Sequence, residues 1–113
     1  MNNPQALRRV FTRTLIAGLR VVWPILSGLI GAMIALGIVI GLLEGWPLHQ
    51  SIYFSFITGL TIGYGDIVPR SPLTRSIAVL IGVCGLLLTA LVAAVAVRAL
   101  TATLDDAKSD PPP

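Results

Sequence analysis

The stretch 61–66 (Thr-Ile-Gly-Tyr-Gly-Asp) is the part of this chain whose residue types and spacing could do chemistry. Gly63 and Gly65 are two residues apart, and glycine adopts positive φ without the steric penalty of a Cβ. If left- and right-handed residues alternate here, successive carbonyl oxygens turn to the same side of the strand. Four such strands around an axis would form stacked rings of neutral oxygen ligands. The predicted chemistry is therefore the passage of a dehydrated monovalent cation along a backbone path.

Two long apolar segments flank this stretch and must position it. Residues 21–43 carry no charge, and residues 73–100 are nearly as apolar. About 20 apolar residues in a helix cross the ~30 Å hydrocarbon core of a bilayer, so both segments are predicted to span a membrane. The whole chain is 55% hydrophobic and 12% charged, with a mean hydropathy of +0.87. That composition leaves too few polar residues to cover a soluble domain.

The segment 48–60 is apolar but too short to span, and is predicted as a re-entrant pore helix. Glu44-Gly45-Trp46-Pro47 ends the helix before it. Irregular backbone at membrane depth survives only where protein buries it or where it lines a water-filled cavity. The predicted fold class is therefore an all-α membrane protein, with two transmembrane helices, a pore helix and a filter loop at 61–66.

The basic residues predict the orientation of the chain in the membrane. Six of them lie near the two ends and two lie in the connection between the spans: Arg8, Arg9, Arg13, Arg20, Arg98 and Lys108 against Arg70 and Arg75. Excess basic residues stay on the cytoplasmic side, so both termini are expected there, in the plasma membrane. Because these residues adjoin apolar segments, their predicted partner is the membrane surface and not nucleic acid.

The two ends of the chain are predicted to lie outside the pore domain, which is expected at 21–100. In residues 1–20, apolar side chains recur at helical spacing and the arginines mostly occupy the other face. This pattern favours a helix on the membrane surface that contacts anionic lipids, and a charged tail without structure is the alternative. Residues 101–113 are acidic and proline-rich, and are expected to form a short disordered tail.

The stretch 61–66 resembles the signature of potassium channels, with Ile62 where valine is usual. Tyr53-Phe54-Ser55-Phe56 before it and Ile67-Val68-Pro69 after it also match that family. The resemblance covers nearly the whole chain and is closest to the small bacterial channels with two transmembrane helices. It implies a homotetramer, a bacterial source and a potassium-selective pore.

The resemblance also implies a role for each filter residue. Thr61 would bind K⁺ with its hydroxyl and carbonyl oxygens. Ile62, Gly63 and Tyr64 would contribute carbonyl oxygens, and Gly65 would line the mouth. The ring of Tyr64 would point away from the ions. K⁺ is then the transported ion, and no organic cofactor is expected.

The surroundings of Asp66 differ from the family's pattern. Some members place a carboxylate at the position of Ile57 and an indole at the position of Phe54, and both reach the aspartate that ends the filter. Neither residue here offers a polar partner. We therefore expect Tyr53 or water to take over this contact, and the slow inactivation of the filter to change.

The gate is less clearly marked in the sequence. Gly85 follows Tyr64 at the distance where the family often has a hinge glycine in the inner helix. Gly82, one turn earlier, could serve equally, and either glycine could instead allow close helix packing. Thr89, Ala93 and Ala96 follow Gly85 at helical spacing and are candidates to line an inner vestibule.

Other functions lack their usual sequence signals. No arginine-rich span indicates a voltage sensor, and no group of residues indicates catalysis, so the protein is not expected to be an enzyme. Gating is expected to depend on the membrane, pH, the filter or a separate partner. His49 is either a solvated residue or a pH sensor, and Cys84 is expected to pack as a small apolar residue.

Four alternatives remain open at this point. A non-selective cation channel would usually lack Tyr64 or Gly65. A subunit of a potassium carrier would usually carry several degenerate filter repeats in one long chain. A two-span protein that transports nothing would leave the stretch 61–66 unexplained. The chain could also be the pore fragment of a larger channel.

Overall fold

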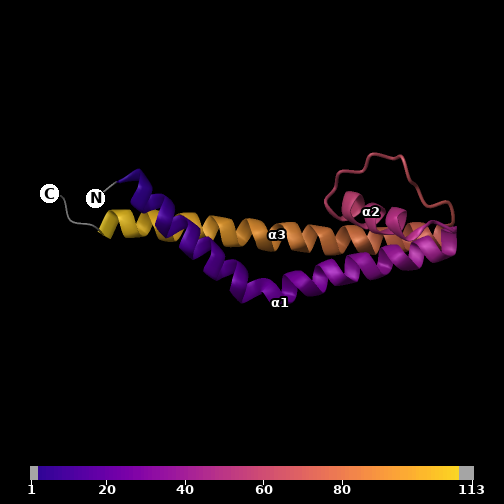
Figure 1. Ribbon diagram of the computed structural model, residues 1–113, viewed down its shortest axis with the longest axis horizontal. Helices are drawn as coiled ribbons and strands as arrows, with labels where there is room; N and C mark the ends of the chain where they lie inside the picture. Colours follow the sequence, from indigo (N-terminus) through magenta and orange to yellow (C-terminus); the bar gives the residue numbers. More distant parts are fainter. Residues whose placement is uncertain (1–2, 110–113) are drawn as a thin grey trace. The chain divides into compact units, whose positions relative to one another are not determined.

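The computed structural model describes residues 3–109, and these form three helices joined by two irregular connections (Figure 1). The helices are α1 (Pro4–Glu44), α2 (Leu48–Gly59) and α3 (Pro72–Ser109). The part of the chain that the structure describes contains no β-strand. The predicted all-α fold class is confirmed.

Helix α1 begins and ends with capping structures that its sequence supplies. At the start, the side chain of Asn3 accepts a hydrogen bond from the backbone N–H of Gln5 at 3.0 Å, and Pro4 occupies the first turn, where its missing N–H costs nothing. At the end, Gly45 has φ +78° and the N–H of Trp46 bonds to the carbonyl of Gly41 at 2.8 Å. That bond belongs to the Schellman arrangement, which requires a left-handed residue. The end of α1 agrees with the expected end at 43.

The start of α1 differs from the prediction, because the helix does not begin near Val21. It runs without a break from Pro4 through Pro24 to Glu44, over 41 residues. At ~1.5 Å per residue that is about 60 Å, roughly twice the hydrocarbon core. The expected segment 1–20 is therefore helical from Pro4 and continuous with the outer helix.

Helix α2 is short, as expected from its sequence. It has 12 residues, or about 18 Å, and so cannot cross a bilayer. Pro47 is its N-cap, and the carbonyl of Pro47 accepts hydrogen bonds from Gln50 and Ser51. The helix ends at Gly59, close to the predicted end at 60.

Helix α3 begins where the sequence indicated and ends later. The side chain of Ser71 accepts a hydrogen bond from the N–H of Thr74 at 3.2 Å and so caps the helix. The helix continues to Ser109, so the expected disordered tail is wrong for residues 101–109. The physical reason is packing: Ala99 and Thr103 are buried, which extends the stabilised helix past the apolar span. Residues 110–113 of that predicted tail lie outside the described residues.

The chain divides into two compact units, which we describe separately. Unit 2 is residues 25–89, and unit 1 combines residues up to 24 with residues from 90 onward. One of the two boundaries falls at Pro24, where proline removes a hydrogen bond from the helix. Unit 2 contains all of α2 and the stretch 61–66.

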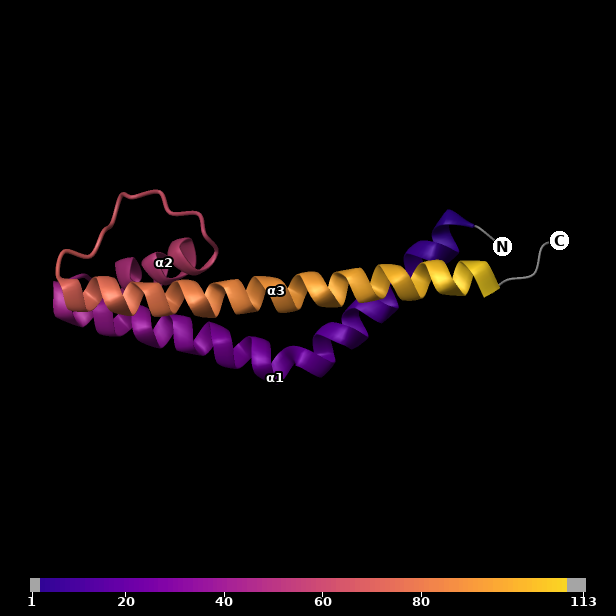
Figure 2. The ribbon, with the colours of Figure 1, turned by 180° about the vertical axis from the view of Figure 1, so that it is seen from behind.

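The core of unit 2 joins all three helices. Met33 and Ile40 of α1, Phe54 of α2 and Ile81 of α3 form a buried cluster. Figures 1 and 2, seen from opposite sides, both show α2 lying beside the α1 and α3 segments of this unit. Small residues bring the helices together: a Cβ on Gly37 would overlap the side chain of Ser55. Close approach through small residues is the usual way in which membrane helices pack.

Unit 1 pairs the first part of α1 with the last part of α3. A Cβ on Gly18 would lie 2.8 Å from Cγ1 of Val95, so the two helices are in contact there. The apolar residues that the sequence assigned to the membrane surface lie mostly on the half-buried face of α1: Leu7, Val10, Phe11 and Leu15. Because α3 occupies that face, the N-terminal helix uses its apolar side mainly for packing within the protein.

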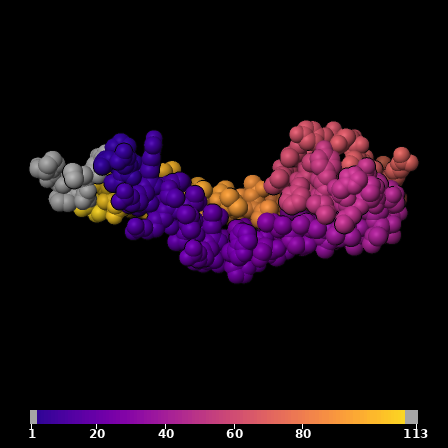
Figure 3. Space-filling model, viewed as in Figure 1, coloured from indigo at the N-terminus to yellow at the C-terminus, as the bar shows by residue number. Residues whose placement is uncertain are grey.

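The surfaces of α1 and α3 are apolar enough for a membrane. Both helices pass the length and hydropathy criteria for a membrane span, and only 11% of the most apolar stretch of α3 is buried. An apolar helix that is exposed in the single chain needs lipid or neighbouring subunits as its environment. The space-filling view in Figure 3 shows α2 and the following loop gathered at one part of the surface of unit 2.

Candidate functional site

The backbone of the stretch 61–66 alternates in handedness. Thr61, Gly63 and Gly65 have φ of +64°, +58° and +77°. Among the described residues, only Gly45 shares this property. The alternation expected from the spacing of the glycines is therefore present. It is the backbone conformation that turns successive carbonyl groups toward one side of a strand.

Thr61 is the unusual member of this series. A β-branched residue with positive φ is a genuine outlier, and such a conformation costs on the order of 1–3 kcal/mol. It persists only where the surrounding structure imposes it, and strain of this kind gathers at functional sites. The strained threonine lies where the motif predicts the innermost ion ligands.

The end of α2 imposes the conformation at the start of the filter. The carbonyl of Ile57 accepts hydrogen bonds from the N–H groups of both Ile62 and Gly63, each at 2.9 Å. The N–H of Thr61 bonds to the carbonyl of Thr58 at 3.2 Å. These bonds occupy the first three N–H donors of the strand, those of residues 61–63, and leave the carbonyl oxygens of these residues available as ligands. The last turn of α2 also directs the partial negative charge of a helix C-terminus toward the start of the filter.

Gly85 of α3 packs directly against the end of α2. A Cβ on Gly85 would overlap the backbone carbonyl of Gly59, whereas a Cβ on Gly82 would meet nothing within 4 Å. Of the two readings that the sequence left open for Gly85, close packing has a direct structural basis. A role for Gly85 or Gly82 as a hinge stays a prediction.

Asp66 ends the filter and has a partner in α2. The hydroxyl of Tyr53 donates a hydrogen bond to Oδ2 of Asp66 at 2.9 Å, which is the contact expected once Phe54 and Ile57 offer no polar group. Phe54 and Ile57 are both buried, and the Phe54 ring meets the Trp46 ring edge to face at 5.1 Å between centroids. These two residues therefore position α2, and Tyr53 makes the polar link.

The link between Tyr53 and Asp66 shifts the titration of the tyrosine. The hydrogen bond to Asp66, together with partial desolvation and the nearby negative charge, raises the pKa of Tyr53 above its ordinary value of about 10. The hydroxyl is therefore protonated and able to donate throughout the neutral range.

Glu44, which the sequence indicated only as part of a helix end, connects the two long helices. Its Oε1 accepts hydrogen bonds from the N–H groups of Arg70 and Ser71, at 2.9 and 3.2 Å, and from the hydroxyl of Thr74 at 2.5 Å. Thr74 is buried. One carboxylate oxygen thus holds the end of α1, the loop that follows the filter and the first turn of α3.

Two further features concern Glu44: a neighbouring cavity and its place in the sequence. A polar cavity of about 390 Å³ lies between this link and the filter; it is lined by Glu44, Trp46, Gln50, Asp66, Ile67, Val68 and Arg70. The sequence also held a signal, because Glu44 is the first acidic residue of the chain and follows directly after an apolar span. An isolated carboxylate at that place needs a partner.

The remaining predicted residues are exposed or half-buried in the single chain. The Tyr64 side chain is 71% exposed. Thr89 and Ala93 are exposed, and Ala96 is half-buried. His49 is exposed, and Cys84 is a half-buried free thiol at the edge of the core of unit 2. No group of three or more metal-binding side chains occurs within residues 3–109.

Comparison with known proteins identifies the family. The model of a family described as "Ion channel" matches residues 27–102. The chain belongs to this family. It is also 40% identical over 53 residues to a nematode protein, "TWiK family of potassium channels protein 7" of Caenorhabditis elegans, a match that covers 47% of this chain and 10% of that protein. No solved structure matches.

These findings confirm the resemblance to two-transmembrane potassium channels and the assignment to a membrane-embedded ion-channel family. The family model spans the region from α1 to α3, and includes α2 and the stretch 61–66. The chain spans about a tenth of the length of the nematode relative. The properties of that whole protein are therefore carried over only as proposals.

Proposed function

We propose that this ion channel is the pore-forming subunit of a homotetrameric, potassium-selective channel. The observation that carries the proposal is the run of positive φ at Thr61, Gly63 and Gly65 within a motif that resembles the potassium-channel signature. The similarity to a protein named as a potassium channel supports the choice of ion. The activity is transport, and no catalytic step is required.

K⁺ would be coordinated by oxygen atoms from four copies of the filter. Thr61 would supply its hydroxyl and carbonyl oxygens, and Ile62, Gly63 and Tyr64 would supply carbonyls, with Gly65 at the mouth. A ring of carbonyl oxygens replaces the hydration shell of the ion without the charge that would trap it. The link between Tyr53 and Asp66 would hold the outer end of this path.

A tetramer follows from what a single chain leaves exposed. All six residues of the stretch 61–66 are exposed in the single chain, and unpaired backbone is costly inside a membrane. One copy also provides only one side of an ion cage. A closed cyclic tetramer covers the exposed faces of α3 and completes the rings.

The proposed setting is the plasma membrane, with both termini in the cytoplasm, as the distribution of basic residues predicts. Anionic lipids would then contact the arginines near the N-terminus. A separate partner could set the opening of the pore. The potassium-channel protein to which the chain is similar comes from a nematode, and a bacterial source stays a prediction.

The test is the current through purified full chain in planar bilayers, with K⁺ on one side and Na⁺ on the other. We expect a reversal potential near the potassium equilibrium value, and block by Ba²⁺. Gly63→Ala should abolish selectivity, because a Cβ at φ +58° strains the strand by on the order of 1–2 kcal/mol.

Gly28→Ala is the matched control, since a Cβ on Gly28 meets nothing within 4 Å and its φ is not positive. It should leave selectivity unchanged. A reversal potential near zero in the unchanged protein would contradict potassium selectivity while keeping the channel. A dimer as the largest crosslinked species in a bilayer would contradict the tetramer.

A further inference from the structure

Helices α1 and α2 meet along one row of residues from each helix. Met33, Gly37 and Gly41 are spaced four residues apart and therefore share one face of α1. A Cβ on Gly41 would overlap the side chain of Ser51, and a Cβ on Gly37 would overlap that of Ser55. At these two positions α1 contributes the glycine, and α2 contributes the side chain that packs against it.

The third position of this row has the opposite arrangement. A Cβ on Gly59 of α2 would overlap the terminal methyl group of Met33 and would lie 3.0 Å from its sulfur atom. Met33 is 0% exposed, and Gly59 is buried as well. Here α1 contributes the long side chain, which occupies the space that a side chain at position 59 would need.

This contact lies at the end of α2. Gly59 is the last residue of that helix, and its carbonyl lies directly against Gly85 of α3. The last turn of α2 is therefore in close contact with a side chain of α1 and with the backbone of α3.

The last turn of α2 is also bonded to the start of the filter. The carbonyls of Ile57 and Thr58 accept hydrogen bonds from the N–H groups of residues 61–63. The positive φ of Thr61 is strained and persists only where the surrounding structure imposes it. A shift of the last turn would weaken these bonds and allow Thr61 to relax.

We propose that Met33 is a positioning residue for the inner end of the filter. Its thioether packs against Gly59 and keeps the carbonyls of Ile57 and Thr58 in place for the filter amides. Methionine suits this position, because its unbranched, flexible side chain fills irregular space in a core. The inference rests on the proposed function, in which Thr61 binds K⁺ with its hydroxyl and carbonyl oxygens.

The first measurement is hydrogen–deuterium exchange of the purified full chain in detergent, read at the amides of residues 61–63. Met33→Ala removes the contact with Gly59, so we expect these amides to exchange about tenfold faster. This is the change in population that corresponds to strain of the size carried by Thr61. Met33→Leu nearly conserves the volume of the side chain and should leave the exchange rates close to those of the unchanged protein.

Ile40→Ala is the matched control. Ile40 is also 0% exposed on α1 and belongs to the same core cluster as Met33, so its truncation should lower the stability of unit 2 to a similar degree. It lies about 10 Å farther along α1, and its truncation should leave the exchange of the filter amides unchanged.

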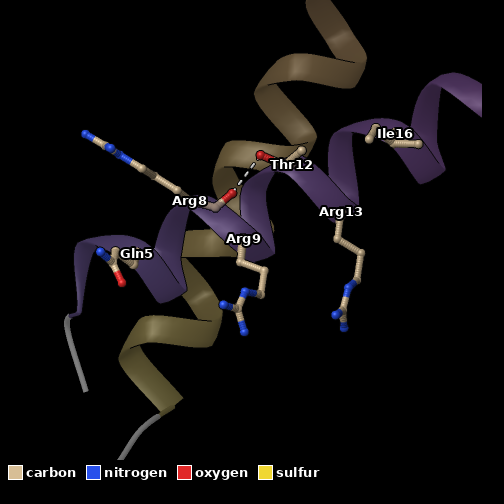
Figure 4. A pocket seen from close by; sticks show the side chains of 6 residues that line it. All are labelled: Gln5, Arg8, Arg9, Thr12, Arg13 and Ile16. Atoms are coloured by element: carbon tan, nitrogen blue, oxygen red, sulfur yellow. Dashed lines mark hydrogen bonds between the residues drawn. The ribbon is translucent and has the colours of Figure 1, made fainter.

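Ile16→Ala is a second control, for truncation of an apolar side chain of α1 outside unit 2. Ile16 is 50% exposed and lies at the edge of a shallow cavity in unit 1 (Figure 4), which is also lined by Gln5, Arg8, Arg9, Thr12 and Arg13. This variant should change neither the stability of unit 2 nor the exchange of the filter amides.

The double variant Met33→Ala/Gly59→Ala tests the contact itself. The methyl group added at position 59 points into the space that the truncated Met33 vacates. The exchange rates should therefore return part of the way to those of the unchanged protein. Two unrelated destabilising substitutions would instead add their effects.

The second measurement is the reversal potential in planar bilayers with K⁺ and Na⁺ on opposite sides. Met33→Ala should raise the permeability to Na⁺ relative to K⁺ about tenfold. Ile40→Ala should leave this ratio unchanged, although both variants lose stability.

Three results would overturn the proposal. Equal increases of exchange in Met33→Ala and Ile40→Ala would show a general loss of stability. Unchanged exchange in Met33→Ala would show that the last turn of α2 is held without this side chain. In a potassium-selective channel, an unchanged permeability ratio in Met33→Ala would separate the filter from Met33. The exchange rates are read without current, so a channel that proves non-selective contradicts the proposed function and not the role of Met33.

Discussion

The contacts inside unit 2 differ in kind from the contacts inside unit 1. In unit 2, polar side chains join residues that are distant in sequence: Glu44 bonds to Thr74, and Tyr53 bonds to Asp66. In unit 1, the side-chain hydrogen bonds of Thr14 and Thr103 reach only the preceding turn of the same helix. The two helices of that unit meet through apolar and small side chains.

This difference indicates what each unit can tolerate. Directional bonds between distant residues hold the segments on both sides of the strained filter backbone. The loss of one partner or the addition of one methyl group should therefore change the stability of unit 2 strongly. Apolar contact between two helices has no such directionality and can adjust by small shifts. Substitutions in unit 2 should therefore reduce the stability of the protein more than comparable substitutions in unit 1.

The largest expected effect is that of Gly85→Ala in unit 2. The added methyl group would overlap the Gly59 carbonyl, which is backbone and cannot rotate away as the end of a flexible side chain can. We expect a loss of about 3 kcal/mol, the upper end for overpacking, measured by denaturant unfolding in detergent. Gly82→Ala is the control, and should be neutral or slightly stabilising because alanine favours a helix over glycine. Equal effects would contradict the close-packing role.

The next largest effect is expected at Glu44. Glu44→Ala removes the acceptor shared by Arg70, Ser71 and Thr74, so the amides of Arg70 and Ser71 should exchange with deuterium faster. Glu44→Gln keeps one carbonyl acceptor and should give an intermediate rate. Gln50→Ala, in the same cavity, is the control. If the amides of Arg70 and Ser71 remained protected from exchange in Glu44→Ala, other contacts would hold the loop that follows the filter.

A smaller effect is expected from Tyr53→Phe, which removes one hydrogen bond and keeps the ring. The amides of the filter should exchange several-fold faster. Because the pKa of Tyr53 is raised, the stabilisation from this bond is fully present below about pH 10 and is lost as the pH rises through the raised pKa. The rate at which the filter amides exchange with deuterium, corrected for its intrinsic pH dependence, should therefore stay constant from about pH 6 to 9. A change in this rate between about pH 6 and 9 that Tyr53→Phe does not show would contradict the role given to the Tyr53 hydroxyl.

The smallest effect is expected in unit 1. The methyl group in Gly18→Ala would lie 2.8 Å from Cγ1 of Val95, and α3 can shift to relieve this contact. We expect a cost of about 1 kcal/mol or less, and Val95→Ala in the same chain should remove it, which a double-mutant cycle would measure. A loss of stability as large as that of Gly85→Ala would contradict the expectation that unit 1 tolerates substitutions better than unit 2.

Much of the fold could be predicted because the membrane leaves few choices. The apolar run before Glu44 and the short segment after Pro47 are helices because every backbone group in lipid must find an internal partner. The sequence also predicted the positive φ of Gly63 and Gly65, since glycine adopts it without strain, but it did not predict the positive φ of Thr61.

Only the tertiary structure decided which residues far apart in sequence meet. Nothing in the pattern around Glu44 names Arg70 or Thr74 as its partners, because a hydrogen bond depends on where two helices place their ends. Gly82 and Gly85 are equivalent in sequence, and only the position of Gly59 distinguishes them. The helical extension past residue 100 likewise accompanies the burial of Ala99 and Thr103. Local propensity and the bilayer determine which segments of this chain form helices. Packing between the helices determines which residues meet at the candidate site.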